Sequence, residues 1–200
     1  MSLKPTLYYL DARARAETIR FILKLKGVKF NDVRLKEIPA DLKARTSFGQ
    51  VPFYEDKDIS LSQSLSIESY LSEIHGLAGY TTVERALISQ FVHATQDVYN
   101  PYFRANDEAS NTKFRDEIAP KFLTRFQQHL KAAGGEHFVG GRLTHADISV
   151  FALLDYFHQQ THNNLPEVLA PFTLLESFYN KIASIPEIAE HLQTRPKTRL

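Results

Sequence analysis

Cysteine and tryptophan are absent from this 200-residue sequence, and methionine occurs once. Without cysteine the chain can form no disulfide and no thiolate metal ligand, so any thiol chemistry requires a bound molecule that brings its own sulfur. No stretch approaches the run of about 18 apolar residues that a membrane-spanning helix needs. The first residues, Met1–Pro5, show no charged leader followed by an apolar run, so we expect no signal peptide. These absences favour a cytoplasmic protein without a membrane partner.

An excess of either charge is also missing. The chain has 24 lysines and arginines against 23 aspartates and glutamates, a net charge of +1. This balance gives no sign of a nucleic-acid or polyanion partner, because such partners select a basic surface. Hydrophobic residues make up 43% of the chain, which is ordinary for a globular protein. The length allows one large domain or two small ones.

Short strand-like runs alternate with helical patterns in the first third of the sequence. Aromatic and β-branched runs predict strands, and apolar residues repeating every three or four positions predict helices. A strand, a helix and a second strand predict a parallel pair of strands. The predicted strands are Thr6–Leu10, Lys29–Leu35, Val51–Glu55 and one beginning at Ile59–Leu61, and the predicted helices are Ala14–Lys26, a short one in Pro39–Ala44, and Leu65–His75.

From Thr82 onward the pattern is entirely helical. We expect a long helix over Glu84–Asn100 that ends at Pro101, because proline cannot continue the hydrogen-bond ladder. A second helix is expected over Asn111–Ala133, which Pro120 could bend. The change of pattern predicts an α/β domain over residues 1–79 and an all-α domain over residues 82–200. Further helices are predicted at Thr144–His158, Pro171–Ile182 and Pro186–Thr194.

Three short motifs in a fixed order carry a family resemblance. They are Tyr9 with Arg15, the Gln50–Pro52 turn and the Gln63–Ser64 pair. Together they resemble the sigma class of glutathione transferases, which includes haematopoietic prostaglandin D synthase, over essentially the whole chain. The resemblance implies a thioredoxin-like glutathione-binding domain followed by an all-helical domain with the electrophile pocket and the dimer contacts. It also implies a cytoplasmic homodimer, with glutathione as the cosubstrate and small hydrophobic electrophiles as partners.

A tyrosine is the expected catalytic residue. The nucleophile of a transferase is the thiolate, whereas a free cysteine thiol has a pKa of about 8.5. One hydrogen bond to a charged acceptor is worth about 1.5–3 kcal/mol, and one pKa unit about 1.4 kcal/mol, so one phenol O–H could lower the thiol pKa by about one to two units. Tyr8 and Tyr9 face opposite sides of a strand, and the sequence alone favours neither. The resemblance, which places the catalytic tyrosine six residues before an arginine, selects Tyr9.

Arginines follow this tyrosine at the start of the first predicted helix. A positive charge at Arg15 would favour a nearby thiolate, and the resemblance gives Arg15 a catalytic role, although an isolated arginine is usually a solvated surface residue. Arg13 more simply fits the surface interpretation, but it too could line the site.

Two turns are expected to hold the backbone of glutathione. The resemblance makes Val51–Pro52, preceded by Gln50, a cis-proline turn that pairs with the backbone of the cysteinyl residue. Base rates alone would favour an ordinary trans proline at a strand start. Gln63 and Ser64 open a helix whose free N–H groups suit the γ-glutamyl carboxylate. The simpler alternative is that Ser64 is only a helix N-cap.

Lys43 matches the family lysine that pairs with the glycyl carboxylate of glutathione. The sequence departs from the family here, because the tryptophan expected a few residues earlier is missing and Ile38 or Pro39 occupies its place. An exposed lysine without a role is almost as good an interpretation of Lys43.

Asp97 matches the family aspartate that crosses the dimer interface to the glutamyl amino group of the neighbour's ligand. A solvated helix carboxylate is the alternative. The metal-activated prostaglandin synthase has two further aspartates on this helix, and His93 and Gln96 stand in those places here. We therefore expect no metal site.

Thr144–Asp147 has the spacing of a helix capping box, for which we expect a structural role. The expected reaction is attack of the glutathione thiolate on an electrophile. Two alternatives remain: a glutathione-dependent prostaglandin D synthase, and a non-catalytic carrier or crystallin-like protein on the same fold.

Overall fold

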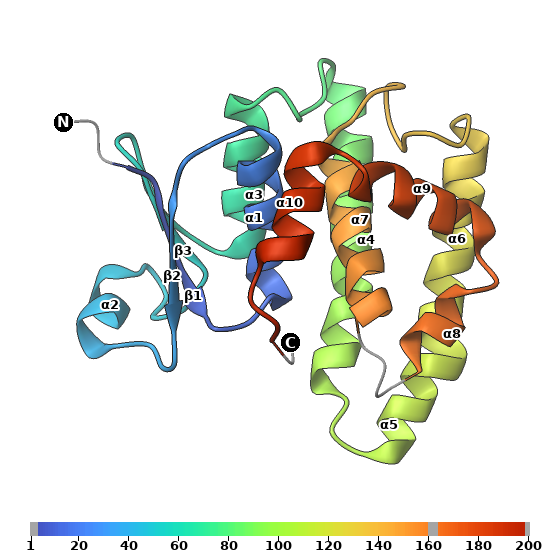
Figure 1. The fold of residues 1–200 in the computed structure, drawn as a ribbon, viewed down its shortest axis with the longest axis horizontal. Helices are drawn as coiled ribbons and strands as arrows, with labels where there is room; N and C mark the ends of the chain where they lie inside the picture. The colour runs from blue at the N-terminus through green and yellow to red at the C-terminus, as the bar shows by residue number, and fades with distance from the viewer. Residues whose placement is uncertain (1–3, 160–163, 199–200) are drawn as a thin grey trace. The chain divides into compact units, whose positions relative to one another are not determined.

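The computed structural model describes residues 4–159 and 164–198, and the chain divides into two compact units. Unit 1 comprises Met1–Gly76 together with Ile185–Leu200, and unit 2 comprises Leu77–Ser184. A four-stranded sheet lies in unit 1, whereas the described residues of unit 2 contain helices and no strand (Figure 1). The predicted fold class, a thioredoxin-like α/β domain followed by an all-α domain, is confirmed.

The sheet of unit 1 has the strand order β2-β1-β3-β4. β1 (Thr6–Leu10) and β2 (Asn31–Leu35) run parallel, as the strand–helix–strand pattern predicted. β3 (Phe53–Glu55) runs antiparallel to β1, and β4 (Ser60–Ser62) runs antiparallel to β3. β1 therefore lies inside the sheet, between two partner strands.

Helices cover both faces of this sheet. Figure 1 shows α1, α3 and α10 on one face and α2 on the other, and α1 packs against both α3 and α10. Ile22 of α1 and Ile67 of α3 are fully buried. After α1, Gly27 adopts a φ of 63°, a left-handed conformation that suits glycine, as predicted for the residue that ends this helix. The helical segments of unit 1 are η1 (Ala14–Ala16), α1 (Glu17–Leu25), α2 (Ala40–Arg45), α3 (Ser64–Ile74) and α10 (Pro186–Thr194).

The last helix, α10, belongs to unit 1 although it follows unit 2 in the chain. The sequence pattern assigned all of residues 82–200 to the second domain, because α10 has the same helical pattern as the segments before it. In space α10 packs on α1, with Ile188 fully buried and His191 beside Glu17. The compact units differ in this respect from the predicted domains, whose boundaries as separately folding segments stay a prediction.

Unit 2 has its core around α7, which is buried continuously from His145 to Phe157 and packs against α4. The predicted capping box precedes it: the backbone N–H and the hydroxyl of Thr144 donate to Asp147 Oδ2 at 2.7 and 2.8 Å. No helix within residues 4–159 and 164–198 is long and apolar enough to cross a membrane. The helical segments of unit 2 are α4 (Thr82–Arg104), α5 (Glu108–Lys113), η2 (Phe114–Ile118), α6 (Ala119–Ala132), α7 (His145–Gln159), α8 (Leu165–Leu169) and α9 (Thr173–Ala183).

Two predicted helix boundaries in unit 2 are wrong. α4 continues through Pro101 to Arg104, because proline removes only its own N–H, and the amide of Ala105 closes the helix by donating to the Pro101 carbonyl at 3.0 Å. The single helix predicted over Asn111–Ala133 is divided by η2, a π-helical segment. Pro120 then lies in the first turn of α6, directly after η2.

Candidate functional site

A cavity of about 480 Å³ lies in unit 1, where the carboxyl end of β1, η1, the turn before β3 and the start of α3 meet. Seven of its nine lining residues are predicted site residues. The cavity therefore gathers three sequence motifs into one place. The lining residues are Tyr9, Leu10, Arg15, Ile38, Gln50, Val51, Pro52, Gln63 and Ser64.

The two adjacent tyrosines of β1 have different surroundings. Tyr9 is 7% exposed and lines the cavity. Tyr8 lies against the ring of Phe53, with 5.9 Å between the ring centroids, and the guanidinium of Arg45 lies 5.7 Å from its ring centroid. Because neighbouring strand residues face opposite sides, Tyr9 is the one that meets the cavity. The structure thus distinguishes two tyrosines that the sequence alone left equal, while the catalytic role of Tyr9 stays a prediction.

The hydroxyl oxygen of Tyr9 accepts a hydrogen bond from the backbone N–H of Arg15 at 3.4 Å. Burial raises the pKa of the Tyr9 phenol, and this hydrogen bond and the charges of Arg15 and Arg20 offset only part of the rise. Since the pKa of an ordinary tyrosine is about 10, the phenol keeps its proton at neutral pH. Tyr9 can therefore donate its O–H to an acceptor in the cavity.

The turn before β3 has the predicted backbone: the Val51–Pro52 peptide bond is cis. Gln50, one residue earlier, accepts a hydrogen bond at its Oε1 from Nε2 of Gln63 at 3.3 Å. This bond connects the proline turn to the start of α3, so the two predicted glutathione-binding turns lie side by side on one wall of the cavity.

The start of α3 has an unusual backbone. Gln63 has φ 75° and ψ 117°, a region that residues other than glycine rarely occupy. Gln63 is the N-cap, and Ser64, 7% exposed, is the first helical residue, so the simple alternative in which Ser64 is the N-cap is wrong. Without a side-chain cap, the first turn of α3 presents N–H groups and the positive end of the helix dipole, an arrangement that favours an anion.

Lys43 does not line this cavity but is exposed on α2. Of the two residues in the place of the family tryptophan, Ile38 lines the cavity and Pro39 is the N-cap of α2. The side chain of Ile38 supplies apolar surface and, unlike that of tryptophan, has no N–H group to donate. The role of Lys43 stays a prediction.

Asp97 is exposed on α4 in unit 2, and its contact with a ligand is a prediction that the fold leaves untested. On the same helix, His93 Nδ1 lies 2.8 Å from the carbonyl oxygen of Ser89. Across residues 4–159 and 164–198, no group of three or more histidines, aspartates or glutamates could hold a metal ion.

Sequence reasoning missed two kinds of residue at this site. Leu10 lines the cavity, which its position after Tyr9 at the end of β1 could have indicated. Arg20 is fully buried behind the site. The available signal for Arg20 was its spacing from Glu17, since oppositely charged residues three apart on a helix face can pair.

Two family models match the chain. The first, described as the N-terminal domain of glutathione S-transferase, matches residues 5–73. The second, described as the C-terminal domain of glutathione S-transferase, matches residues 94–195. The first match contains every residue of the cavity in unit 1, and the second contains Asp97.

Individual proteins are similar over nearly the whole chain. Glutathione S-transferase alpha-1 of Rattus norvegicus is 31% identical over 211 residues, which cover 100% of this chain and 93% of the relative. The sigma-class glutathione transferase structure from Fasciola hepatica superposes with a TM-score of 0.87 at 26% identity, covering 99% of each chain. A structure described as prostaglandin synthase D of Nilaparvata lugens has a TM-score of 0.84 at 26% identity, covering 98% of this chain and 100% of that one.

Proposed function

Because the chain belongs to the glutathione S-transferase family and is a transferase, we propose that it joins the sulfur of glutathione to small hydrophobic electrophiles. Members of this family use glutathione as a cosubstrate. The observation that carries the proposal is the cavity of unit 1, in which the buried phenol of Tyr9, the side chain of Arg15 and the start of α3 meet.

Tyr9 holds the glutathione sulfur as a thiolate by donating its O–H to it. A hydrogen bond to a charged acceptor is worth about 1.5–3 kcal/mol, and at about 1.4 kcal/mol per unit it lowers the thiol pKa by about one to two units. The positive charge of Arg15 acts in the same direction. The thiol proton passes to solvent, the thiolate forms a bond to the electrophilic carbon, and the leaving group departs with the electrons of its broken bond.

The rest of glutathione binds along the same wall. Its γ-glutamyl carboxylate accepts hydrogen bonds from the N–H and hydroxyl of Ser64 at the start of α3, and Gln63, held by Gln50, reaches the amino or carboxylate group. The backbone of Val51, before the cis Pro52, pairs with the backbone of the cysteinyl residue as an added strand would.

Two further contacts complete the proposed site. Lys43 pairs with the glycyl carboxylate, for which Ile38 offers no donor. The enzyme is a cytoplasmic homodimer, and Asp97 of the partner subunit meets the glutamyl amino group. Lys43 does not line the cavity that contains Tyr9, so it should affect the binding of glutathione and not the reaction at the sulfur. A Lys43→Ala variant should therefore raise the KM for glutathione and leave kcat nearly unchanged.

We assign the enzyme to the sigma class. Support comes from the order of the Tyr9, Gln50–Pro52 and Gln63–Ser64 motifs and from the similarity to the Fasciola hepatica sigma-class structure. The named relatives at about 31% identity belong instead to the alpha class. A Pi-class structure superposes almost as well as the sigma-class one, with a TM-score of 0.86, so the proposed class rests on the motifs.

Tyr9→Phe tests the proposed chemistry, with Tyr8→Phe as the matched control on the opposite face of β1. We expect Tyr9→Phe to lower kcat with a chloronitrobenzene substrate by about tenfold to a hundredfold, the rate equivalent of one charged hydrogen bond. Calorimetric affinity for glutathione should change by less than about threefold, and Tyr8→Phe should behave as the wild type. Full activity in Tyr9→Phe would overturn the catalytic role, and failure of the wild type to bind immobilised glutathione would overturn the function.

A second candidate function is the isomerisation of prostaglandin H to prostaglandin D, with glutathione bound but not consumed. The similarity to the Nilaparvata lugens structure described as prostaglandin synthase D favours it. Incubation with prostaglandin H and a limiting amount of glutathione separates the two functions: isomerisation continues past one turnover per glutathione, whereas conjugation stops when the thiol is exhausted.

A further inference from the structure

Buried charged side chains form a cluster in unit 1 where α1 meets α10. Glu17 begins α1, and its Oε1 lies 2.9 Å from both Nε2 of His191 and Nη1 of Arg195. The three side chains are only 5–6% exposed. A shared carboxylate therefore joins the first helix of the chain to the last.

Arg20 extends this cluster to the loop of the glutathione site. Its fully buried guanidinium donates from Nη1 to Glu17 Oε2 at 2.9 Å and to the carbonyl of Ala12 at 2.8 Å. Its Nε donates to Asp32 Oδ1 on β2 at 3.1 Å. Ala12 lies in the turn between β1 and η1, three residues before Arg15, whose backbone N–H meets the Tyr9 hydroxyl. A continuous chain of hydrogen bonds and backbone thus connects α10 with the catalytic pair.

The same turn has a second connection to the C-terminal segment. Arg13, expected at the surface or lining the site, does neither: it is only 5% exposed, does not line the glutathione cavity, and donates from Nη2 to the carbonyl of Thr198 at 3.4 Å. The residues between β1 and η1 are therefore linked to the C-terminal segment twice, directly through Arg13 and indirectly through Arg20 and Glu17.

We propose that Glu17 is a positioning residue of the glutathione site, through which α10 sets the placement of Arg15 against Tyr9. The proposal rests on the proposed function in taking Tyr9 and Arg15 as the catalytic pair. Glu17 touches neither of them and acts through Arg20 and the Ala12 carbonyl.

The geometry of these bonds explains why a small movement would matter. A guanidinium is a planar, rigid donor group, so a shift of the Glu17 carboxylate turns Arg20 and displaces its other bond, to Ala12. The bond from Arg15 to Tyr9, at 3.4 Å, already lies beyond the usual range of about 2.7–3.2 Å for such hydrogen bonds. A further displacement of a few tenths of an ångström would remove it.

The charge of Glu17 is constant under the conditions of catalysis. Burial alone would raise the pKa of Glu17, but the hydrogen bond with His191 and the charges of Arg20 and Arg195 outweigh it and hold the pKa far below its ordinary value. Glu17 is therefore an anion at neutral pH, held between two arginines.

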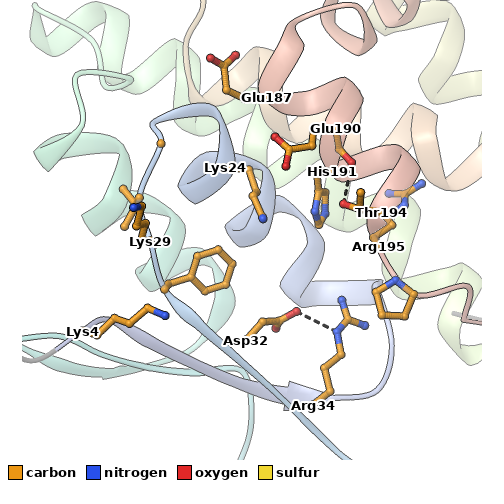
Figure 2. A pocket seen from close by; sticks show the side chains of 14 residues that line it. Lys4, Lys24, Lys29, Asp32, Arg34, Glu187, Glu190, His191, Thr194 and Arg195 are labelled. Carbon is orange, nitrogen blue, oxygen red and sulfur yellow. Dashed lines mark hydrogen bonds and ion pairs between the residues drawn. The ribbon is translucent and has the colours of Figure 1, made fainter.

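A second cavity of unit 1, of about 560 Å³, lies beside one end of the cluster, so side chains there can be substituted with little crowding. Figure 2 shows His191 and Arg195 on its α10 side and Asp32 on its β2 side. Glu17 and Arg20 do not line it. A larger side chain at position 191 can extend into this cavity. Substitutions of His191 can therefore remove its bond to Glu17 without overpacking the interior of unit 1.

Variants of His191 test the proposal while leaving the catalytic pair intact. His191→Phe keeps a ring against Phe21, which His191 now meets edge-on with centroids 5.3 Å apart, and removes the bond to Glu17. His191→Gln returns an N–H donor near the same place. Glu17→Gln weakens all the ionic bonds of the cluster and should have the larger effect.

The main readout is the titration of Tyr9 in glutathione-free protein, followed by the NMR signal of its ζ-carbon and assigned with Tyr9→Phe. Because the Arg15 N–H bond lowers the phenol pKa, we expect His191→Phe to raise that pKa by about half a unit to one unit. Its kcat for conjugation should fall about threefold to fivefold, with the KM for glutathione within about twofold. His191→Gln should restore both values.

Glu84→Gln is the control, because it removes an ion pair with Arg142, 3.0 Å apart, that lies wholly in unit 2. It should leave the Tyr9 titration unchanged. The proposal is overturned if His191→Phe and Glu17→Gln lower the unfolding temperature but leave the Tyr9 titration and kcat at wild-type values. If Glu17→Gln does not fold, the comparison of His191→Phe with His191→Gln tests the proposal. Since the titration needs no glutathione, it remains decisive even if the wild type fails to bind glutathione and the proposed function is rejected.

Discussion

Each unit of the molecule buries a carboxylate in the first turn of a helix, and the two carboxylates have opposite surroundings. Glu17 in unit 1 meets two arginines and a histidine. Asp147 in unit 2 accepts its hydrogen bonds from neutral donors, the backbone N–H of Phe138 at 2.9 Å and the N–H and hydroxyl of Thr144, and has no arginine partner among the described residues; Nδ1 of His137 lies farther off, at 3.6 Å. The pKa of Glu17 is strongly lowered, whereas burial raises the pKa of Asp147 despite its hydrogen bonds.

Similar burial thus produces opposite preferences for the proton, because cations compensate a buried charge more fully than neutral donors do. The two carboxylates also differ in how far along the sequence their hydrogen-bond partners lie. Glu17 connects to His191, 174 positions away, whereas the partners of Asp147 are three and nine positions away. The carboxylate paired with arginines joins distant parts of the chain, and the carboxylate of Asp147 fixes a local helix start.

Removing the carboxylate of Glu17 should have the largest effect. Among the described residues, Glu17→Ala leaves the fully buried Arg20 with Asp32 alone as a charged partner, and breaking a buried pair typically costs about 3–5 kcal/mol. We expect a loss of about 4 kcal/mol in the free energy of unfolding in urea. The double variant Glu17→Ala/Arg20→Met should recover part of this loss, since it also removes the stranded cation. A loss below about 1 kcal/mol would show that the cluster stabilises little.

Removing the capping carboxylate of Asp147 should cost somewhat less. Asp147→Ala leaves the buried N–H groups of Phe138 and Thr144 without their acceptor, and orphaned buried donors cost about 1–3 kcal/mol each. We expect a loss of about 3 kcal/mol. Asp147→Asn should lose less, because an amide oxygen can still accept one of these bonds. Equal losses for alanine and asparagine would mean that packing, not hydrogen bonding, sets the effect.

The pH dependence of two milder variants should sharpen the contrast. The lowered pKa of Glu17 means that its contribution is present above the unfolded-state pKa and is lost as the pH falls through the folded-state value. The raised pKa of Asp147 means that its contribution is fullest in acid and is lost as the pH rises through the folded-state value. Between about pH 7 and pH 4, the cost of Asp147→Asn should therefore grow while that of Glu17→Gln stays nearly level, and below about pH 4 the cost of Glu17→Gln should shrink. Urea unfolding at several pH values measures both slopes, and slopes of equal sign would contradict the comparison.

An exposed ion pair should give the smallest effect. Lys181 Nζ lies 2.9 Å from Glu136 Oε2, but the two side chains are 47% and 74% exposed. Solvent and salt screen such a pair, so Lys181→Ala should leave the unfolding midpoint in urea unchanged within error at physiological salt. A loss comparable to that of Asp147→Asn would show that geometry matters more than burial in this molecule.

Much of the fold follows from local sequence signals. The parallel β1–β2 pair, the end of α1 at Gly27 and the capping box at Asp147 are each determined by residues close in sequence. The assignment of α10 to unit 1 could not be predicted in this way, because it depends on the pairing of Glu17 with His191. The end of α4 was misplaced because a single Pro101 interrupts one hydrogen bond and not the packing of the helix. The short α8 (Leu165–Leu169) was not predicted at all.

The site shows the same division. The motifs predicted Tyr9, Arg15 and the turns at Pro52 and Ser64, and one cavity contains them all. The choice between Tyr8 and Tyr9 needed the strand's orientation, which periodicity alone does not give. Arg20 was expected on the surface from its helical position; the spacing from Glu17 indicated one partner, whereas its burial depends on Asp32, which is distant in sequence.

The backbone of Gln63, with a φ of 75°, limits which sequences can keep this protein working. Glycine tolerates such a conformation, whereas β-branched valine, isoleucine and threonine do not. The main-chain shape therefore restricts the residues that fit at position 63, independently of any contact that the glutamine side chain makes. A library of all residues at position 63, selected only for correctly folded protein, would already be biased towards the few residues that keep the N-terminus of α3 in place.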